Sequence, residues 1–250
     1  MDLADGLGLE DDELVSFVGA GGKKTAMGHL VAEAADRGLD AGYTTSVQMP
    51  PPPDVPLALT DGERPSADLD DVTAPVAIAR ARVSDPDRVD EKVRGYAPDV
   101  LSSVFAGGRF DWLLVKADGA RMREFKAPGA DEPQIPTAST VVVPVVSVRA
   151  IGQPLTDDIV HRVDRIERCT ALSAGERITA AAVGQVLAHP DGGLKNVPAD
   201  ATVVPLVNKA DTATLERRAT DALSTALART SRFDRGLVTS FETDRLVVVN

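Results

Sequence analysis

The stretch ELVSFVGAGGKKT, residues 13–25, passes from an apolar run into a loop rich in glycine. Glu13–Val18 is typical of a buried strand, whereas the residues from Lys24 to Arg37 place apolar side chains at helical spacing, and Gly38 follows as a stop signal. Glycines let backbone amides approach a ligand closely, and the start of a helix adds partial positive charge. The stretch therefore predicts a strand, an anion-binding loop and a helix.

Segments of the same two kinds alternate along the rest of the chain. Apolar runs predict strands at residues 41–45, 76–83, 112–117, 141–148, 203–207, 236–241 and 245–249. Helical patterns appear at residues 84–94, 98–106, 156–171, 179–187 and 212–229. This order predicts a three-layer α/β fold, a mostly parallel sheet with helices on both faces, like that of phosphate-loop NTPases. We expect one domain over residues 1–250, with residues 1–12 extended or disordered.

The amino-acid composition restricts the classes of protein to which this chain can belong. The chain of 250 residues has a formal net charge of −11, and 43% of its residues are hydrophobic. It contains 27 Asp but only 7 Lys, which favours a protein adapted to high salt, with an ordinary acidic protein as the alternative. No basic patch is present to neutralise phosphates, so we expect no nucleic-acid binding. No apolar run is long enough for a membrane span, and residues 1–12 lack signal-peptide character, so we expect a soluble cytoplasmic protein.

The glycine loop is the first candidate site. Its predicted phosphate-binding residues are Gly19, Ala20, Gly21, Gly22, Lys23, Lys24 and Thr25. A full phosphate-loop pattern has Gly at position 17 and Ser or Thr at position 24, whereas this chain has Phe17 and Lys24. A tight strand-to-helix turn without a ligand is the alternative. Three glycines within four positions exceed what such a turn requires, which favours phosphate binding.

The second candidate site follows the apolar strand at residues 112–117. Asp118 comes directly after it and precedes a glycine, and we assign it as the catalytic carboxylate and as a ligand of Mg²⁺. Thr25 is the other candidate Mg²⁺ ligand, since its hydroxyl could replace the one missing at position 24. A solvated aspartate in a turn is the alternative.

The third candidate site is the tetrad Asn208-Lys209-Ala210-Asp211, which follows an apolar strand and precedes an amphipathic helix. It matches the Asn-Lys-x-Asp pattern of proteins that bind guanine nucleotides. The carboxylate of Asp211 would accept hydrogen bonds from N1–H and the 2-amino group of guanine, which adenine lacks in that arrangement. Asn208 would orient the loop, and the stem of Lys209 would cover the base. Alternatively, Asp211 only caps the helix that begins at Thr212.

With these sites placed, the chain resembles the family of selenium-dependent hydroxylase accessory proteins (YqeC-type) over roughly residues 12–250. The residues that carry the resemblance are Phe17–Lys23, Thr44-Thr45, Ala117–Arg121, Lys126-Ala127-Pro128, Glu132-Pro133, Ile135-Pro136, His161-Arg162, Gly193-Leu194-Lys195 and Asn208–Asp211. The resemblance implies a nucleotide-binding protein linked to the maturation of molybdenum hydroxylases or of their cofactor.

Two residues depart from the family pattern. The family usually has Thr where this chain has Lys24, and an acid where it has Lys116. Both changes place positive charge where Mg²⁺ chemistry needs oxygen ligands. We therefore expect the protein to bind GTP or ATP with a weakened dependence on Mg²⁺, and to hydrolyse the nucleotide slowly or not at all.

Further polar residues lie near these sites in the sequence. Arg121, Lys126 and Glu132 are candidates for a second anionic ligand, with solvated surface positions as the alternative. Thr44 and Thr45 are candidates for switch-like contacts to a terminal phosphate, with a plain strand end as the alternative.

The leading hypothesis is a nucleotide-binding maturation factor for a molybdenum hydroxylase, with GTP favoured over ATP. A small-molecule kinase or ligase that uses the same loop is one alternative. A non-hydrolysing interaction module is the other.

Overall fold

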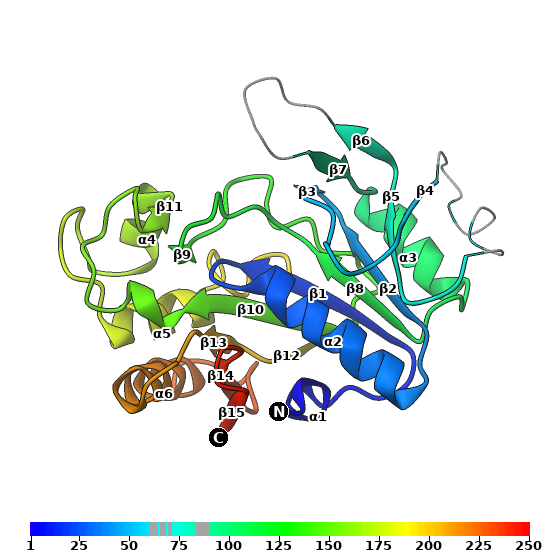
Figure 1. Cartoon of the computed structure of the whole chain (residues 1–250). Helices are drawn as coiled ribbons and strands as arrows, with labels where there is room; N and C mark the ends of the chain where they lie inside the picture. Colours follow the sequence, from blue (N-terminus) through cyan, green and yellow to red (C-terminus); the bar gives the residue numbers. More distant parts are fainter. Residues whose placement is uncertain (61–64, 66–68, 70–71, 84–90) are drawn as a thin grey trace.

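A computed structural model describes residues 1–60, 65, 69, 72–83 and 91–250 (Figure 1). Ten of the described strands form one sheet, in the order β15-β14-β13-β10-β1-β8-β2-β5-β4, with β12 paired to β10. Their bounds are β1 Glu13–Gly19, β2 Ala41–Thr45, β4 Leu57–Leu59, β5 Val76–Ala79, β8 Trp112–Lys116, β10 Val141–Ser147, β12 Thr202–Val203, β13 Leu206–Asn208, β14 Gly236–Ser240 and β15 Arg245–Val249. All pairs in this sheet are parallel except β14 with β15.

Helices cover both faces of this sheet (Figure 1). They are α1 Leu3–Leu7, α2 Lys23–Arg37, α3 Pro98–Ala106, α4 Val163–Cys169, α5 Ala180–Ala188 and α6 Ala213–Leu227, with a 3₁₀ turn η2 at Val148–Ala150. Successive residues of a strand point to opposite faces. Val145 accordingly packs in the same core cluster as α1 and α2, while Val146 packs with α5 and α6. The predicted three-layer, mostly parallel α/β fold is thus confirmed.

Two smaller sheets lie outside this core. One pairs β9, Phe125–Lys126, with β11, Val160–His161. The other contains β3 Gln48–Met49, β6 Ala81–Val83 and β7 Lys92–Arg94 in the order β3-β7-β6. Among the described residues, no helix is long and apolar enough to cross a membrane.

The helix predicted at residues 84–94 is wrong where the structure describes it. Lys92–Arg94 is a strand, β7, that pairs with both β3 and β6. Residues 84–90 lie outside the described part. The helix predicted at residues 156–171 is likewise too long, because only its second half, α4, is helical. Its first half is a turn followed by the two-residue strand Val160–His161, which pairs with Phe125–Lys126. That partner lies 35 positions away in the sequence, so local periodicity cannot indicate it.

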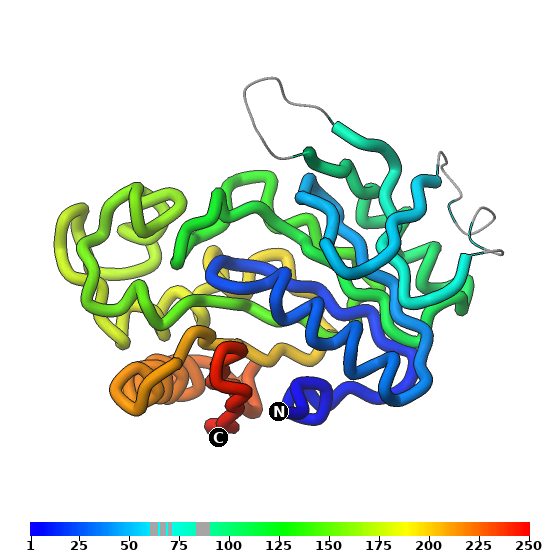
Figure 2. Tube along the Cα trace, viewed as in Figure 1, coloured from blue at the N-terminus to red at the C-terminus, as the bar shows by residue number. Residues whose placement is uncertain are grey.

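The N-terminal segment also differs from the prediction. Residues 3–7 form helix α1, whereas residues 1–12 were expected to be extended or disordered. The side chain of Asp2 accepts a hydrogen bond from the Asp5 amide at the start of α1, and Gly8 ends the helix in a left-handed conformation. Leu3 and Leu7 are fully buried, so packing against the core holds this short helix in place. The two ends of the chain lie side by side (Figure 2). The N-terminal amine contacts Asp244 at 2.7 Å.

Candidate functional site

The glycine loop lies at the carboxyl end of β1, the strand at the centre of the sheet. Gly19, Gly21 and Gly22 have φ angles of 89°, 91° and 135°, a region that residues with a Cβ atom rarely adopt. A Cβ atom on Gly21 would lie 2.4 Å from the backbone nitrogen of Ser147 on β10, so the loop passes directly against the next strand. No side chain caps the first turn of α2. The first amides of the helix are therefore not bonded by a capping side chain, as an anion site at a helix N-terminus requires.

Lys23, the last residue of the glycine motif, points back into the loop. Its ammonium group donates to the carbonyl oxygen of Gly19 and lies 2.8 Å from Oδ1 of Asp118. The Gly19 amide donates to the other carboxylate oxygen at 2.8 Å. Lys23 and Asp118 are 5% and 1% exposed, so this ion pair is buried. The predicted phosphate-loop lysine and the predicted carboxylate thus meet in space.

Asp118 continues into a chain of alternating charges. Oδ2 of Asp118 lies 2.9 Å from Nζ of Lys126, and the same ammonium lies 2.8 Å from Oε2 of Glu132. Nη1 of Arg162 approaches that oxygen of Glu132 at 2.7 Å. We call Lys23, Asp118, Lys126, Glu132 and Arg162 the charge chain. It contains three cations and two carboxylates, so positive charge is in excess at the site.

Burial and these ion pairs act on the pKa of each carboxyl group in opposite directions. Burial alone would raise the pKa of Asp118, but the charges of Lys23 and Lys126 outweigh it and lower the pKa below its usual value. For Glu132, the hydrogen bond from Arg162 and the charge of Lys126 likewise outweigh burial and lower the pKa. Both carboxylates are therefore held ionised as partners of the cations.

Lys116 adds a further cation beside the charge chain. It is the last residue of β8, is 8% exposed, and donates to the backbone oxygen of Gln48 at 3.3 Å. Burial, reinforced by the charge of Lys23, lowers the pKa of Lys116 to about 7. Three of the seven lysines in this acidic chain are thus buried around one aspartate.

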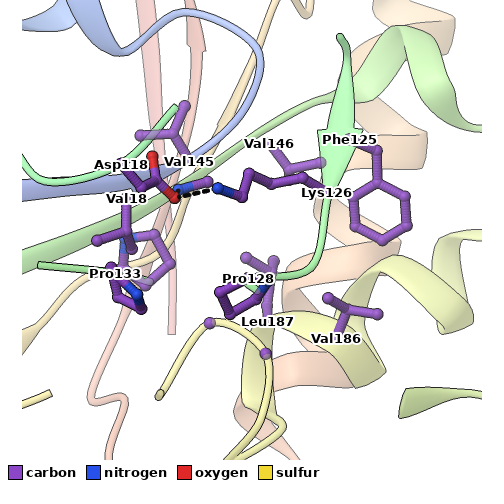
Figure 3. A pocket seen from close by; sticks show the side chains of 14 residues that line it. Val18, Asp118, Phe125, Lys126, Pro128, Pro133, Val145, Val146, Val186 and Leu187 are labelled. Carbon is purple, nitrogen blue, oxygen red and sulfur yellow. Dashed lines mark hydrogen bonds and ion pairs between the residues drawn. The ribbon is translucent and has the colours of Figure 1, made fainter. Parts of the chain in front are cut away.

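A small cavity of about 20 Å³, enough for one water molecule, adjoins the charge chain (Figure 3). Asp118 and Lys126 face one another across its polar side, and Val146, Val186 and Leu187 are among the apolar residues that line it. It has no room for a nucleotide, so any nucleotide would bind on the outside of the loop.

The two predicted Mg²⁺ ligands, Asp118 and Thr25, lie in different surroundings. The carboxylate of Asp118 is already paired with two ammonium groups, and Thr25 is exposed on the first turn of α2. No group of three or more His, Cys, Asp or Glu side chains among the described residues could hold a metal ion. Lys24 is exposed and lies beside Thr25, so it adds another positive charge on the outside of the loop.

The predicted base tetrad lies at the carboxyl end of β13, two strands from β1. Asn208 is 3% exposed, and its Nδ2 donates to the carbonyl oxygen of Gly21 at 3.1 Å. Its Oδ1 accepts a hydrogen bond from Thr239 at 3.1 Å. The side-chain amide therefore ties the tetrad both to the glycine loop and to the neighbouring strand β14.

Asp211 is held from two sides. Ser240 donates to its Oδ1 at 2.7 Å, and Nη2 of Arg149 lies 2.6 Å from its Oδ2. Burial alone would raise the pKa of Asp211, but these two hydrogen bonds lower it. Thr212, rather than Asp211, caps α6 through a bond to the amide of Leu215. The capping alternative for Asp211 is therefore wrong.

Lys209 occupies a left-handed backbone conformation, with a φ angle of 65°, and its ammonium pairs with Glu124 at 2.7 Å. Sequence reasoning did not identify Glu124, Arg149, Thr239 or Ser240. The position of Thr239 and Ser240 at the end of the strand after β13 was the one available signal. Arg149 and Glu124 come close only through the folding of the chain.

The two predicted switch residues lie inside the sheet. Thr44 and Thr45 are fully buried on β2, next to β8. Their hydroxyl groups donate to the backbone oxygens of Ile78 and Lys116, at 2.9 and 2.7 Å. In this arrangement both threonines join neighbouring strands, as in the strand-end alternative.

The candidates for a second anionic ligand gather at β9 and β11. Lys126 and Glu132 belong to the charge chain, and Arg121 is exposed in the loop between β8 and β9. The structure adds His161 and Arg162, because His161 on β11 pairs in register with Lys126 on β9. Sequence analysis placed His161 in a helix, and this prediction was wrong.

Comparison with known proteins gives two results. A family model described as YqeC protein matches residues 15–164, which include the glycine loop and the whole charge chain but end before Asn208. A protein of Escherichia coli (strain K12) named "Uncharacterized protein YqeC" is 27% identical over 203 residues, which are 78% of this chain and 75% of that protein.

Proposed function

Because the chain belongs to the YqeC family, we propose that it is a nucleotide-binding accessory factor that serves the maturation of a molybdenum hydroxylase or its cofactor. The molybdenum hydroxylase as the client, and the link of that client to selenium, are what the sequence resemblance implies. The nucleotide site is argued below from the residues of this chain, with GTP favoured over ATP.

The observation that carries the nucleotide proposal is the hydrogen bond from Asn208 to Gly21. It fixes the base tetrad beside the glycine loop on one edge of the sheet. A nucleotide needs two recognition elements close together, an anion site for its phosphates and a polar site for its base. The loop amides and Lys23 would bind the phosphates. Asp211 would accept the two donors of guanine, and its orientation is fixed by Ser240.

The proposed site differs from a metal-dependent one in its source of positive charge. Lys23, Lys116 and Lys126 are buried beside the loop, and Asp118 is already paired. These ammonium groups would balance phosphate charge that Mg²⁺ balances elsewhere. We therefore expect nucleotide binding that depends weakly on Mg²⁺ and hydrolysis that is slow or absent.

The test is calorimetry of GTP and ATP binding in molar KCl, with and without Mg²⁺. We expect micromolar GTP binding that changes less than about threefold when Mg²⁺ is removed, and that Asp211→Ala abolishes. Asp211→Asn should instead bind xanthosine triphosphate, because an amide can donate to the second ring carbonyl that xanthine presents. The exposed Asp221→Ala on α6 is the matched control.

Two outcomes would contradict the proposal. Absence of binding of either nucleotide would favour the interaction module. Binding with steep Mg²⁺ dependence and several turnovers per second would show that the paired Asp118 becomes a metal ligand after all.

A further inference from the structure

We propose that Arg121, His161 and Arg162 form a subsite for a tetrahedral dianion, the phosphate group of a second ligand or a free oxyanion, next to the nucleotide site. The inference goes beyond the proposed nucleotide function, because it needs no nucleotide and rests on side chains at β11 and at the turn after β8, of which only Arg162 belongs to the charge chain.

The first argument is the arrangement of the backbone. Strands β9 and β11 pair with His161 opposite Lys126, and Arg162 follows His161 at the start of α4. Arg121 comes from the turn between β8 and β9, where the amide of Arg123 bonds to the oxygen of Ala120. Lys126, His161 and Arg162 are thereby brought together, and Arg121 lies close enough for its charge to act on His161.

The second argument is the balance of charge. One oxygen, Oε2 of Glu132, accepts from both Lys126 and Arg162. Lys126 is also shared with Asp118, so these two carboxylates face three cations of the charge chain. Arg121 adds a cation that no described carboxylate pairs with. A chain with a net charge of −11 has many acids available, yet no carboxylate among the described residues pairs with Arg121. An incoming dianion would balance the excess.

The third argument is the state of His161. Among the described residues its imidazole has no hydrogen-bond partner. Burial, Arg162 and Lys126 lower the pKa of His161 to about 4, Glu132 raises it, and Arg121 lowers it further. These groups come from β9, the loop at Glu132, the start of α4 and the turn at Arg121. The imidazole is therefore neutral near neutral pH, first because of burial and then because of the surrounding cations, whose effect an anion would offset.

The turn that carries Arg121 is also unusual. Arg121 and Met122 have φ angles of 47° and 62°, and Met122 is 91% exposed. Two successive residues with side chains in this region are strained, which is most common where a loop has a binding role. The turn is fixed at its base, because Lys126 donates to the oxygen of Gly119 at 2.6 Å. Arg121 is thereby presented from a fixed loop.

The experiment uses the full chain, without nucleotide, at pH 5.5. The protein contains three histidines, His29, His161 and His189, so ¹⁵N spectra of the imidazoles resolve each one, with His161→Gln as the assignment variant. Sulfate replaces chloride at constant ionic strength. We expect His161 to change from the neutral to the protonated form along a saturable curve, with His29 and His189 as internal references. Glycerol phosphate is titrated in the same way at pH 5.5 and at pH 6.5, because its phosphate group is mostly a monoanion at the lower pH and mostly a dianion at the higher one. Tighter binding than sulfate at pH 6.5 indicates a phosphate ester as the ligand, and weaker binding indicates a free oxyanion.

Matched variants locate the anion. Arg121→Ala should weaken sulfate binding at least fivefold, whereas Arg123→Ala, in the same turn, should leave it unchanged. The proposal is overturned if His161 stays neutral both at 50 mM sulfate and at 50 mM glycerol phosphate. It is also overturned if Arg121→Ala binds sulfate as tightly as the wild type does. Because no nucleotide is present, neither result depends on whether the glycine loop binds GTP.

Discussion

The guanidinium of Arg149 lies on the carboxylate that the sequence assigns to base recognition, with Nη2 2.6 Å from Oδ2 of Asp211. In the proposed site a guanine base would bind both oxygens of Asp211, and it would compete with Arg149 for Oδ2. The arginine is 51% exposed, and Glu242 lies 3.7 Å away as an alternative partner. Arg149 is thus placed to compete with the base.

We predict that Arg149→Ala tightens GTP binding roughly fivefold, since an exposed ion pair contributes up to about 1 kcal/mol. ATP binding should not change, because adenine lacks the donors that compete for Asp211. Calorimetry measures both affinities. Arg245→Ala, which removes another exposed pair with Glu216, is the control. Weaker GTP binding by Arg149→Ala would show that the arginine instead contacts the nucleotide.

The buried pair of Lys23 and Asp118 should be strongly coupled. Lys23→Met leaves the Asp118 carboxylate with one fewer ammonium partner, and we expect a loss of about 3 kcal/mol or more in the free energy of unfolding. The double variant Lys23→Met with Asp118→Leu should lose much less than the sum of the two single changes. Urea denaturation measures the cycle. The exposed pair of Arg82 and Glu91 should show coupling below about 1 kcal/mol, and additive losses at Lys23 and Asp118 would contradict the prediction.

Lys116 should make stability depend on pH. Its pKa is about 7 in the folded protein, against 10.5 for an unperturbed lysine. Between these values the unfolded chain binds more protons than the folded one, so the contribution of Lys116 to the free energy of unfolding rises with pH. Lys116→Met should therefore be more stable than the wild type at pH 6.5, by a margin that shrinks by pH 9.5. Urea titrations at both pH values measure this. A constant margin would be inconsistent with the lowered pKa, and the exposed Lys24→Met is the control.

Gly21 should tolerate no side chain. In Gly21→Ala the new Cβ would meet the backbone of Ser147 at 2.4 Å, in addition to the cost of its positive φ. Gly175 has a similar φ of 84° but nothing within 4 Å of the same position, so Gly175→Ala isolates the conformational cost, about 1 kcal/mol. Thermal unfolding should show a clearly larger loss for Gly21→Ala. Equal losses would mean that the loop can move away from β10.

The fold could be predicted where the signal is local. The apolar runs of β1, β8 and β10 and the glycine loop are continuous in sequence, and the structure places them as expected. The strand β11 could not be predicted, because two residues become a strand only when β9 lies beside them.

The candidate site divides in the same way. Lys23, Asp118 and the tetrad from Asn208 follow strand ends, so their meeting at one edge of the sheet could be anticipated. That Asp118 is paired with two lysines could not, since Lys126 and Lys23 approach it from different elements.

The packing of the N-terminal segment beside Trp112 determines which change in the protein tryptophan fluorescence reports. Trp112, the one tryptophan in the chain, donates its indole N–H to the backbone oxygen of Glu10. The guanidinium of Arg37 lies over its ring. The same guanidinium forms ion pairs with Asp2 and Asp5 of the N-terminal segment. Trp112 begins β8, whereas Lys116 ends it at the candidate site. Intrinsic emission will therefore follow the release of the N-terminal segment during unfolding and remain nearly constant when a ligand fills the opposite edge of the sheet.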